Sequence, residues 1–219
     1  NFNSGSGSIT LTGLSASLTS NSATRTNQQP TYTLNFSRPL SGVTTTQLAN
    51  KLSATASCTK TVTANSATSY NVTLSNCADG TVTMSLPANQ VTDSDSNPNT
   101  LLNASSVTLD TVLPSVQITL VQAPSITSRH VYTVLFSESV NGLTAQDFTF
   151  PAGKSVGCSI QGPTGSGAAY TVTLTGCAPG DFGVELANNS VADLAGNIGP
   201  GVGRSEEHTS ELQSRLQIS

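Results

Sequence analysis

The segment Thr31-Tyr32-Thr33-Leu34-Asn35-Phe36-Ser37 decides the fold class of this 219-residue chain. Polar and apolar residues alternate along it, which places Tyr32, Leu34 and Phe36 on one face of a predicted β-strand. The pattern returns 100 residues later, where Tyr132, Val134 and Phe136 alternate in the same way.

The repeat extends over most of the chain at a constant offset of 100 residues. Because the offset does not change, no insertion separates the two copies. A period near 100 is too long for a solenoid repeat and suits tandem sandwich domains. Among the positions that carry the same residue in both copies are those numbered Tyr32, Gly42, Cys58, Tyr70, Leu74, Cys77, Asn89, Asp93 and Asn97 in the first.

Short strands and turns make up the rest of each copy. Apolar residues alternate again over 70–74, 82–86 and 170–174, and glycine-containing turns such as Ser41-Gly42 and Pro179-Gly180 separate such runs. No stretch within the copies shows helical periodicity. The chain is therefore predicted to be all-β, with two antiparallel sandwiches and no helices.

We expect four parts along the chain: a flexible segment 1–8, a first domain 9–111, a second domain 112–203 and a non-native tail 204–219. The junction Leu109–Pro114 closes one copy and opens the next, and its proline predicts a stiff joint that holds the domains end to end. The segment Arg204–Ser214 resembles a translated sequencing-library adapter, so we expect the tail 204–219 to make no sequence-specific packing against either sandwich and the natural chain to continue past Gly203. The alternative is a short amphipathic helix with Leu212 and Leu216 on one face.

Composition narrows the class of protein. Charged residues make up 9% of the chain, and 12 acidic against 8 basic residues give a formal net charge of −4. This argues against a nucleic-acid-binding protein, which needs a basic face. No apolar run reaches the roughly 18 residues that cross a membrane. With 5% aromatic residues and no Trp, the core is aliphatic and thin, which favours small sandwiches over a large α/β enzyme.

Several segments resemble bacterial immunoglobulin-like (Ig-like) repeats: Phe136–Thr144 followed by Asp147-Phe148, the loop Val191–Asn197, and the junction Leu109–Pro114. The resemblance covers about residues 9–203. It implies two tandem Ig-like antiparallel β-sandwiches of Greek-key topology, as found in large secreted and surface-anchored bacterial proteins, including adhesins and biofilm-associated proteins. The first copy departs from the pattern at Arg38-Pro39 and at Ser94–Asn97, which weakens any role carried over to these loops but not the fold.

The cysteines form two pairs with the same spacing, because 19 positions separate Cys58 from Cys77 and Cys158 from Cys177. A polar turn lies midway within each pair, so we predict two disulfides that each clamp a hairpin. No Cys-x-x-Cys is present, which argues against zinc and thioredoxin-like sites. Disulfides indicate an oxidising compartment, and the alternative is four unrelated buried thiols.

A calcium site is a further candidate. Asp93, Asp95, Asn97 and Asn99 place oxygen side chains at alternate positions, and Asp110 lies where the first domain meets the second, so that it could complete an oxygen cage. The loop lacks the central glycine and the terminal glutamate of helical calcium loops. The alternative is an Asx turn, in which the side chains bond to the loop's own backbone.

Catalysis finds little support in the sequence. His130 is the only histidine before the tail and is expected to be an exposed residue at a strand edge. Glu138 and Glu185 are expected to be separate surface charges, too far apart to act as a pair. We therefore predict no enzyme and no cofactor other than the candidate calcium.

The expected role is that of a structural stalk or spacer in a bacterial extracellular or cell-surface protein, with adhesive contacts as an option. The expected partners are neighbouring Ig-like repeats of a longer chain, with a host or matrix surface ligand as an addition; neither nucleic acid nor membrane insertion is expected. The alternative is a carbohydrate- or protein-binding module attached to a secreted enzyme, which a cluster of exposed aromatic residues would favour.

Overall fold

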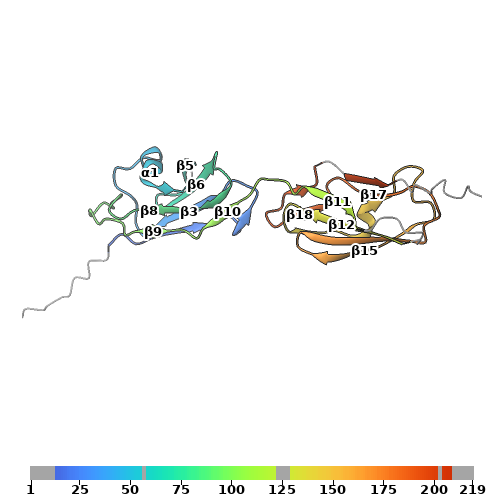
Figure 1. Ribbon diagram of the computed structural model, residues 1–219. Helices are drawn as coiled ribbons and strands as arrows, with labels where there is room; N and C mark the ends of the chain where they lie inside the picture. Colours follow the sequence, from blue (N-terminus) through green and yellow to red (C-terminus); the bar gives the residue numbers. More distant parts are fainter. Residues whose placement is uncertain (1–12, 56–57, 122–128, 202–203, 209–219) are drawn as a thin grey trace, which may run out of the picture. The chain divides into compact units, whose positions relative to one another are not determined.

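The structure is a computed structural model that describes residues 13–55, 58–121, 129–201 and 204–208 (Figure 1). The side chains of residues 204–208 and the expected flexible segment 1–8 lie outside this description. The chain divides into two units, Asn1–Asp110 and Thr111–Ser219, and each builds its own apolar core. The boundary lies one residue before the one expected from the sequence.

One layer of unit 1 is a four-stranded antiparallel sheet in the order β1-β3-β6-β5. Its strands are β1 (Ala16–Ser20), β3 (Thr31–Phe36), β6 (Ser69–Ser75) and β5 (Thr59–Ala64). Tyr32, Leu34 and Phe36 are buried as the alternation predicts, while Asn35 between them is exposed. The alternating residues therefore face the core from this sheet.

Two three-stranded sheets contribute the remaining strands of unit 1, in the orders β4-β8-β9 and β2-β10-β7. Only Thr83 separates β7 from β8, and the buried residues Val82, Met84 and Leu86 of these two strands complete the core. β10 pairs antiparallel with β7 and parallel with β2. The bounds are β2 (Arg25–Thr26), β4 (Ser53–Ala54), β7 (Gly80–Val82), β8 (Met84–Leu86), β9 (Leu102–Asn103) and β10 (Val107–Leu109).

Unit 2 repeats the four-stranded sheet as β11-β12-β16-β15. Its strands are β11 (Val116–Leu120), β12 (Arg129–Phe136), β16 (Ala169–Thr175) and β15 (Ser159–Ser166). Two further sheets have the orders β13-β18-β19 and β14-β17-β20. These strands are β13 (Val140–Asn141), β14 (Phe148–Thr149), β17 (Phe182–Leu186), β18 (Val191–Asp193), β19 (Ile198–Gly199) and β20 (Arg204–His208).

An edge-to-face aromatic pair recurs in the two cores. The ring centroids of Phe36 and Tyr70 lie 6.0 Å apart at 80°, and those of Phe136 and Tyr170 lie 6.1 Å apart at 90°. Such pairs add about 0.5–1.5 kcal/mol beyond the area that they bury. The repeat therefore preserves packing geometry as well as residue type.

The prediction that the chain has no helices is wrong between strands β3 and β4. Helix α1 (Thr45–Lys51) begins there, and the 3-10 helix η1 (Ala145–Asp147) takes the same place in unit 2. Thr44 caps α1, since its hydroxyl accepts from the Gln47 amide at 3.3 Å and the Gln47 Oε1 accepts from the Thr44 amide at 2.9 Å. Elements this short span two helical turns at most, too few to show a helical period. No helix in the described part of the chain is long and apolar enough to span a membrane.

The first five residues of the tail take part in a sheet through their backbone. Arg204–His208 form β20, which pairs antiparallel with β17 over its whole length, from Phe182 opposite His208 to Leu186 opposite Arg204. The physical reason is that ladder hydrogen bonds use backbone groups, which any sequence other than proline supplies. The amphipathic helix considered for 212–216 lies outside the described residues.

Candidate functional site

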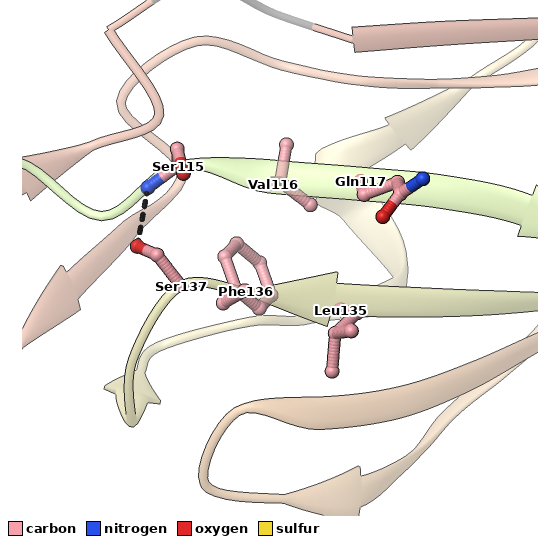
Figure 2. A pocket seen from close by; sticks show the side chains of 6 residues that line it. All are labelled: Ser115, Val116, Gln117, Leu135, Phe136 and Ser137. Carbon is pink, nitrogen blue, oxygen red and sulfur yellow. Dashed lines mark hydrogen bonds between the residues drawn. The ribbon is translucent and has the colours of Figure 1, made fainter.

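A recess of about 370 Å³ opens over β11 and β12 in unit 2 (Figure 2). Ser115, Val116 and Gln117 line one side of it, and Leu135, Phe136 and Ser137 the other. The Ser115 amide donates to the Ser137 hydroxyl at 3.0 Å, which ties the two sides together. None of the six side chains titrates near neutral pH, so the recess offers apolar and weakly polar surface but no acid or base.

Both predicted disulfides are present. Cys58 is joined to Cys77 and Cys158 to Cys177, and no cysteine is free. Cys58 immediately precedes β5, and Cys77 follows β6 by two residues, so the bond closes the open end of the β5–β6 hairpin opposite its turn. The β15–β16 hairpin is closed in the same way. This excludes the alternative of four separate thiols.

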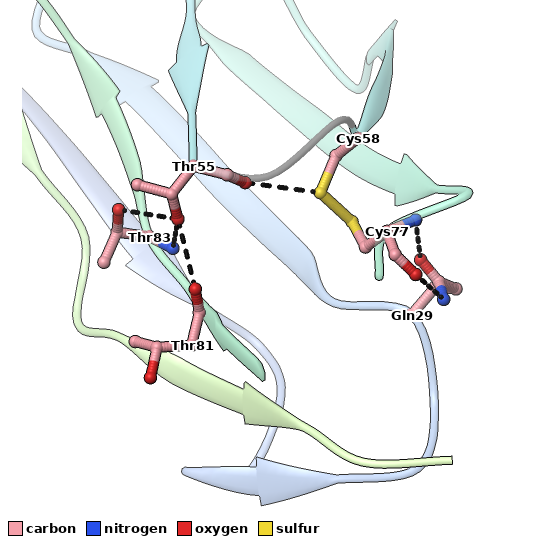
Figure 3. The surroundings of a disulfide bond; sticks show 6 residues. All are labelled: Gln29, Thr55, Cys58, Cys77, Thr81 and Thr83. Carbon is pink, nitrogen blue, oxygen red and sulfur yellow. Dashed lines mark hydrogen bonds between the residues drawn. A yellow bond between two sulfur atoms is a disulfide. The ribbon is translucent and has the colours of Figure 1, made fainter. Parts of the chain in front are cut away.

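Neighbouring polar residues anchor the clamped end of unit 1 (Figure 3). Gln29 holds the backbone of Cys77 at both ends: its Oε1 accepts from the Cys77 amide at 2.9 Å and its Nε2 donates to the Cys77 carbonyl at 3.4 Å. Thr55, three residues before Cys58, accepts from the Thr83 amide at 2.8 Å and donates to the Thr81 carbonyl at 3.3 Å. The disulfide end is therefore attached to both layers of the sandwich.

The candidate calcium loop of unit 1 is organised around one carboxylate. Oδ1 of Asp93 accepts from the amides of Asp95 and Asn97, each at 2.9 Å. Its Oδ2 accepts from Asn97 Nδ2 at 3.0 Å and from Arg38 Nη1 at 3.2 Å. The Asn97 side-chain hydrogen bond holds the pKa of Asp93 below its usual value, with smaller contributions from these amides and from Arg38, while burial opposes the shift.

The equivalent loop of unit 2 has the same shape. Oδ1 of Asp193 accepts from the amides of Ala195, Gly196 and Asn197 at 2.7–2.9 Å, and Oδ2 accepts from Asn197 Nδ2 at 2.8 Å. Burial opposes ionisation of Asp193, but these hydrogen bonds outweigh it, so the pKa of this carboxyl is lowered. In both units the loop is an Asx turn, in which the aspartate carboxylate accepts hydrogen bonds from the backbone amides of its own loop.

The two loops differ in the charge placed beside them. In unit 1 the Arg38 guanidinium lies 3.2 Å from Asp93 and 3.0 Å from Asp95. In unit 2 the position of Arg38 is taken by Glu138, and a carboxylate oxygen of Glu138 lies within 4.8 Å of one on Asp193. Glu138 and Glu185 are both half-buried. Glu138 lies near the Asp193 loop, whereas Glu185 is a residue of β17 and lies opposite Thr149 of β14.

The structure brings Asp93, Asp95 and Asn97 together but directs Asn99 elsewhere. Oδ1 of Asn99 accepts from the amides of Gln90 and Val91, and its Nδ2 donates to two carbonyl oxygens. Asp110 lies 3.9 Å from Arg25. These contacts satisfy the loop through its own backbone and Arg38, which favours the Asx-turn alternative; calcium binding stays a prediction.

His130 is buried, and the expectation of an exposed strand-edge residue is wrong. Its side chain is 8% exposed, and its ring stacks on Phe182 with centroids 3.7 Å apart and planes at 11°. Burial lowers the pKa of His130. The expectation failed because His130 lies two residues before Tyr132 in the same strand. Side chains two residues apart point to the same face of a strand, so His130 faces the core with Tyr132.

Residues 110–210 match a family model described as a bacterial Ig-like domain. This part of the chain is therefore similar to a bacterial Ig-like domain. The match covers most of unit 2, and unit 1 repeats the residue pattern, the four-stranded order and the disulfide of this domain.

Two solved structures are similar to the chain. One is described as the tetra-tandem repeat in the extending region of a large adhesion protein, with 18% identity, a TM-score of 0.32, and coverage of 90% of this chain and 49% of that one. The other is the N-terminal part of the bacterial S-layer protein SbsC, with 15% identity, a TM-score of 0.28, and coverage of 85% and 43%. The chain thus spans about half or less of these structures. No curated protein matches it.

Proposed function

We propose that the chain is a structural spacer of a bacterial extracellular or cell-surface protein, in which Ig-like units in series set a distance and carry tension. This proposal rests on the kind of features that the two units share at the 100-residue offset. The core strands, the aromatic pair and the hairpin disulfide all recur, and each of them holds a unit together. Disulfides further support a location outside the cytoplasm.

The alternative, a carbohydrate- or protein-binding accessory module of a secreted enzyme, would be favoured by a cluster of exposed aromatic residues. Sugar rings stack on exposed aromatic side chains, and every Tyr and Phe in the described part of the chain is buried or half-buried. The exposed large apolar residues in the described ranges are all aliphatic, among them Val112, Val156 and Leu194. This distribution supports the spacer over the binding module.

Pulling single molecules from their two ends tests the spacer. Each unit should resist and unfold in a separate step, because each has its own core. The disulfide keeps the 19-residue interval of each hairpin from extending. Reduction should therefore lengthen each step by about 65 Å, at about 3.5 Å per residue.

A variant with Cys58→Ser and Cys77→Ser is the matched control. Without reductant it should show one lengthened step and one unchanged step, which assigns the steps to unit 1 and unit 2. Extension without measurable resistance in either unit would contradict the spacer. In solution, small-angle scattering should show an elongated particle, and a compact globule would count equally against it.

A further inference from the structure

The sequence contains a single Asn-Gly pair, Asn141 followed by Gly142. Asn141 is the last residue of β13 and lies opposite Ala192 of β18. It is exposed to solvent. The equivalent residues of unit 1 are Ser41 and Gly42, so this asparagine belongs to unit 2 alone.

Two groups of this pair that can react with each other are left without partners. Within the described part of the chain, neither the Asn141 side chain nor the Gly142 amide makes a hydrogen bond. The residue before them is held in place, because the Val140 carbonyl accepts from the Tyr170 hydroxyl at 3.1 Å and the Val140 amide donates to the Gly167 carbonyl at 3.0 Å. Gly142 has φ of 94°, and a side chain there would meet open space. The reacting groups therefore lie at the point where the hydrogen bonding of β13 ends.

The pair Asn65 and Ser66 in unit 1 shows the opposite situation. Asn65 Nδ2 donates to Asn71 Oδ1 at 2.8 Å, and the amide of Ser66 donates to the Ser69 carbonyl at 3.1 Å. Both the side chain and the following amide are thus engaged. A reaction between them must first break these hydrogen bonds, which the pair in unit 2 does not have to do.

We propose that Asn141 is a site of self-modification, at which the nitrogen of Gly142 attacks the side-chain carbonyl carbon and converts the asparagine into aspartate or isoaspartate as the chain ages. Because both groups belong to neighbouring residues, the step is unimolecular. The nitrogen gives up its proton and bonds to Cγ of Asn141, and Nδ2 leaves with a proton as ammonia, which produces a succinimide ring. Water then opens the ring: its hydroxyl stays on the attacked carbonyl carbon and its proton goes to the ring nitrogen. Attack at Cγ gives aspartate, and attack at the backbone carbonyl carbon gives isoaspartate.

Both products change the β13–β18 pair. Each adds a negative charge to β13, where Asp193 of β18 lies opposite Val140 and is held ionised by the hydrogen bonds of its loop. Isoaspartate also carries the main chain through the former side chain, which lengthens β13 by a CH2 group and disturbs its register with β18. The modification therefore weakens unit 2 with time, which goes beyond the spacer role.

Incubation of the full chain at pH 8, followed by denaturation and digestion with trypsin, tests the site. Cleavage after Arg129 and Lys154 releases a peptide in which Asn141 is the only asparagine. This peptide should gain the mass of an amide-to-carboxyl exchange and separate into aspartate and isoaspartate forms. Asn141→Ser, which introduces the residue of unit 1, should abolish the gain. No mass gain in the unmodified chain, or the same gain in the variant, would overturn the proposal.

Ser66→Gly supplies a matched Asn-Gly pair in unit 1, where Asn65 keeps its hydrogen bond to Asn71. In the folded chain Asn65 should convert at least about fivefold more slowly than Asn141, and in urea the two should convert at similar rates because unfolding frees both. Equal rates in the folded chain would show that the dipeptide alone decides the reaction and would contradict the structural basis of the site. The pulling experiment on freshly prepared chain is independent of this result, so the spacer role and the modification site can fail separately.

Discussion

At the scale of single residues, the buried hydroxyl of Tyr32 lacks a hydrogen-bond partner among the described residues. The side chain is fully buried. Burial accordingly raises the pKa of Tyr32. A buried polar group left without a partner costs about 1–3 kcal/mol, whereas an apolar group of the same shape does not.

Tyr32→Phe should therefore leave the free energy of unfolding unchanged or raise it by about 1 kcal/mol. Tyr70→Phe is the control, because the Tyr70 hydroxyl donates to the Ala67 carbonyl at 3.3 Å and its loss should cost about 1 kcal/mol. Urea unfolding of unit 1 measures both. Equal destabilisation by the two substitutions would show that Tyr32 has a partner after all.

The Asx turns offer a test of backbone strain. Ser96 has φ of 65°, a left-handed conformation that costs an L-residue about 1–2 kcal/mol, and Gly196 occupies the same place in unit 2 with φ of 93°. Ser96→Gly should stabilise unit 1 by about 0.5–1 kcal/mol, and Gly196→Ser should destabilise unit 2 by at least as much. Urea midpoints of the two units provide the comparison, and a change of the same sign in both variants would refute the strain argument.

His130 makes the stability of unit 2 depend on pH. Because its folded-state pKa is lowered, the unfolded chain binds a proton first as pH falls through about 6.5. The contribution of neutral His130 to stability is therefore full above that value and is lost as pH falls from about 6.5 toward the folded-state pKa, by at most about 1.4 kcal/mol per pH unit. Urea unfolding at pH 7.5 and 5.5 measures the loss.

His130→Phe keeps an aromatic ring beside Phe182 and should remove most of that pH dependence between 7.5 and 5.5. A loss of stability of the same size in the variant would assign the effect to other groups. Val131→Thr, at the next and half-buried position of β12, provides a control that should retain the pH dependence of the parent chain.

At the scale of elements, α1 depends on its cap. Thr44→Ala removes the hydroxyl that accepts from the Gln47 amide, and the loss should cost unit 1 about 1 kcal/mol. Thr46→Ala lies on the exposed side of the same helix and should be neutral or slightly stabilising, since Ala has the higher helix propensity. Thermal unfolding of both variants makes the comparison, and equal melting temperatures would mean that the cap contributes nothing.

Strands whose apolar and polar residues alternate could be predicted from the sequence, whereas elements without such a periodic pattern could not. Alternation placed the core strands around Tyr32, Tyr70 and Val82, and the cysteine spacing placed both disulfides. Helix α1 was missed because the only local signal for it is the capping box formed by Thr44 and Gln47. β20 was missed because its pairing with β17 depends on a free strand edge, which no residue pattern of its own reveals.

At the scale of the whole molecule, the two units should unfold as separate cooperative entities, because their cores are separate clusters. Leu34→Ala creates a cavity in unit 1 and should cost it about 2–5 kcal/mol while leaving the unfolding free energy of unit 2 unchanged. Val134→Ala should instead destabilise unit 2 and leave the unfolding free energy of unit 1 unchanged. Hydrogen exchange resolved by segment distinguishes the units, and loss of protection in both upon either substitution would contradict this independence.

The candidate site was less predictable than the fold. The spacing of Asp93, Asp95 and Asn97 indicated a shared centre correctly, but the cation beside it is the guanidinium of Arg38, 55 positions away in sequence. Such a partner is selected by tertiary packing, which brings the end of β3 to this loop. The burial of His130 depends likewise on Phe182, a residue of the opposite layer.

The sparse charge of the chain has a consequence for its lifetime among proteases. Between Lys60 and Arg129 the sequence holds neither lysine nor arginine, and this stretch includes the whole joint Leu109–Pro114, in which Val112 and Leu113 are exposed. An enzyme of trypsin specificity therefore finds no bond to cut where the two units are connected. Digestion by such an enzyme cannot separate the units at this joint, whereas one that cuts after aliphatic residues would meet its target there.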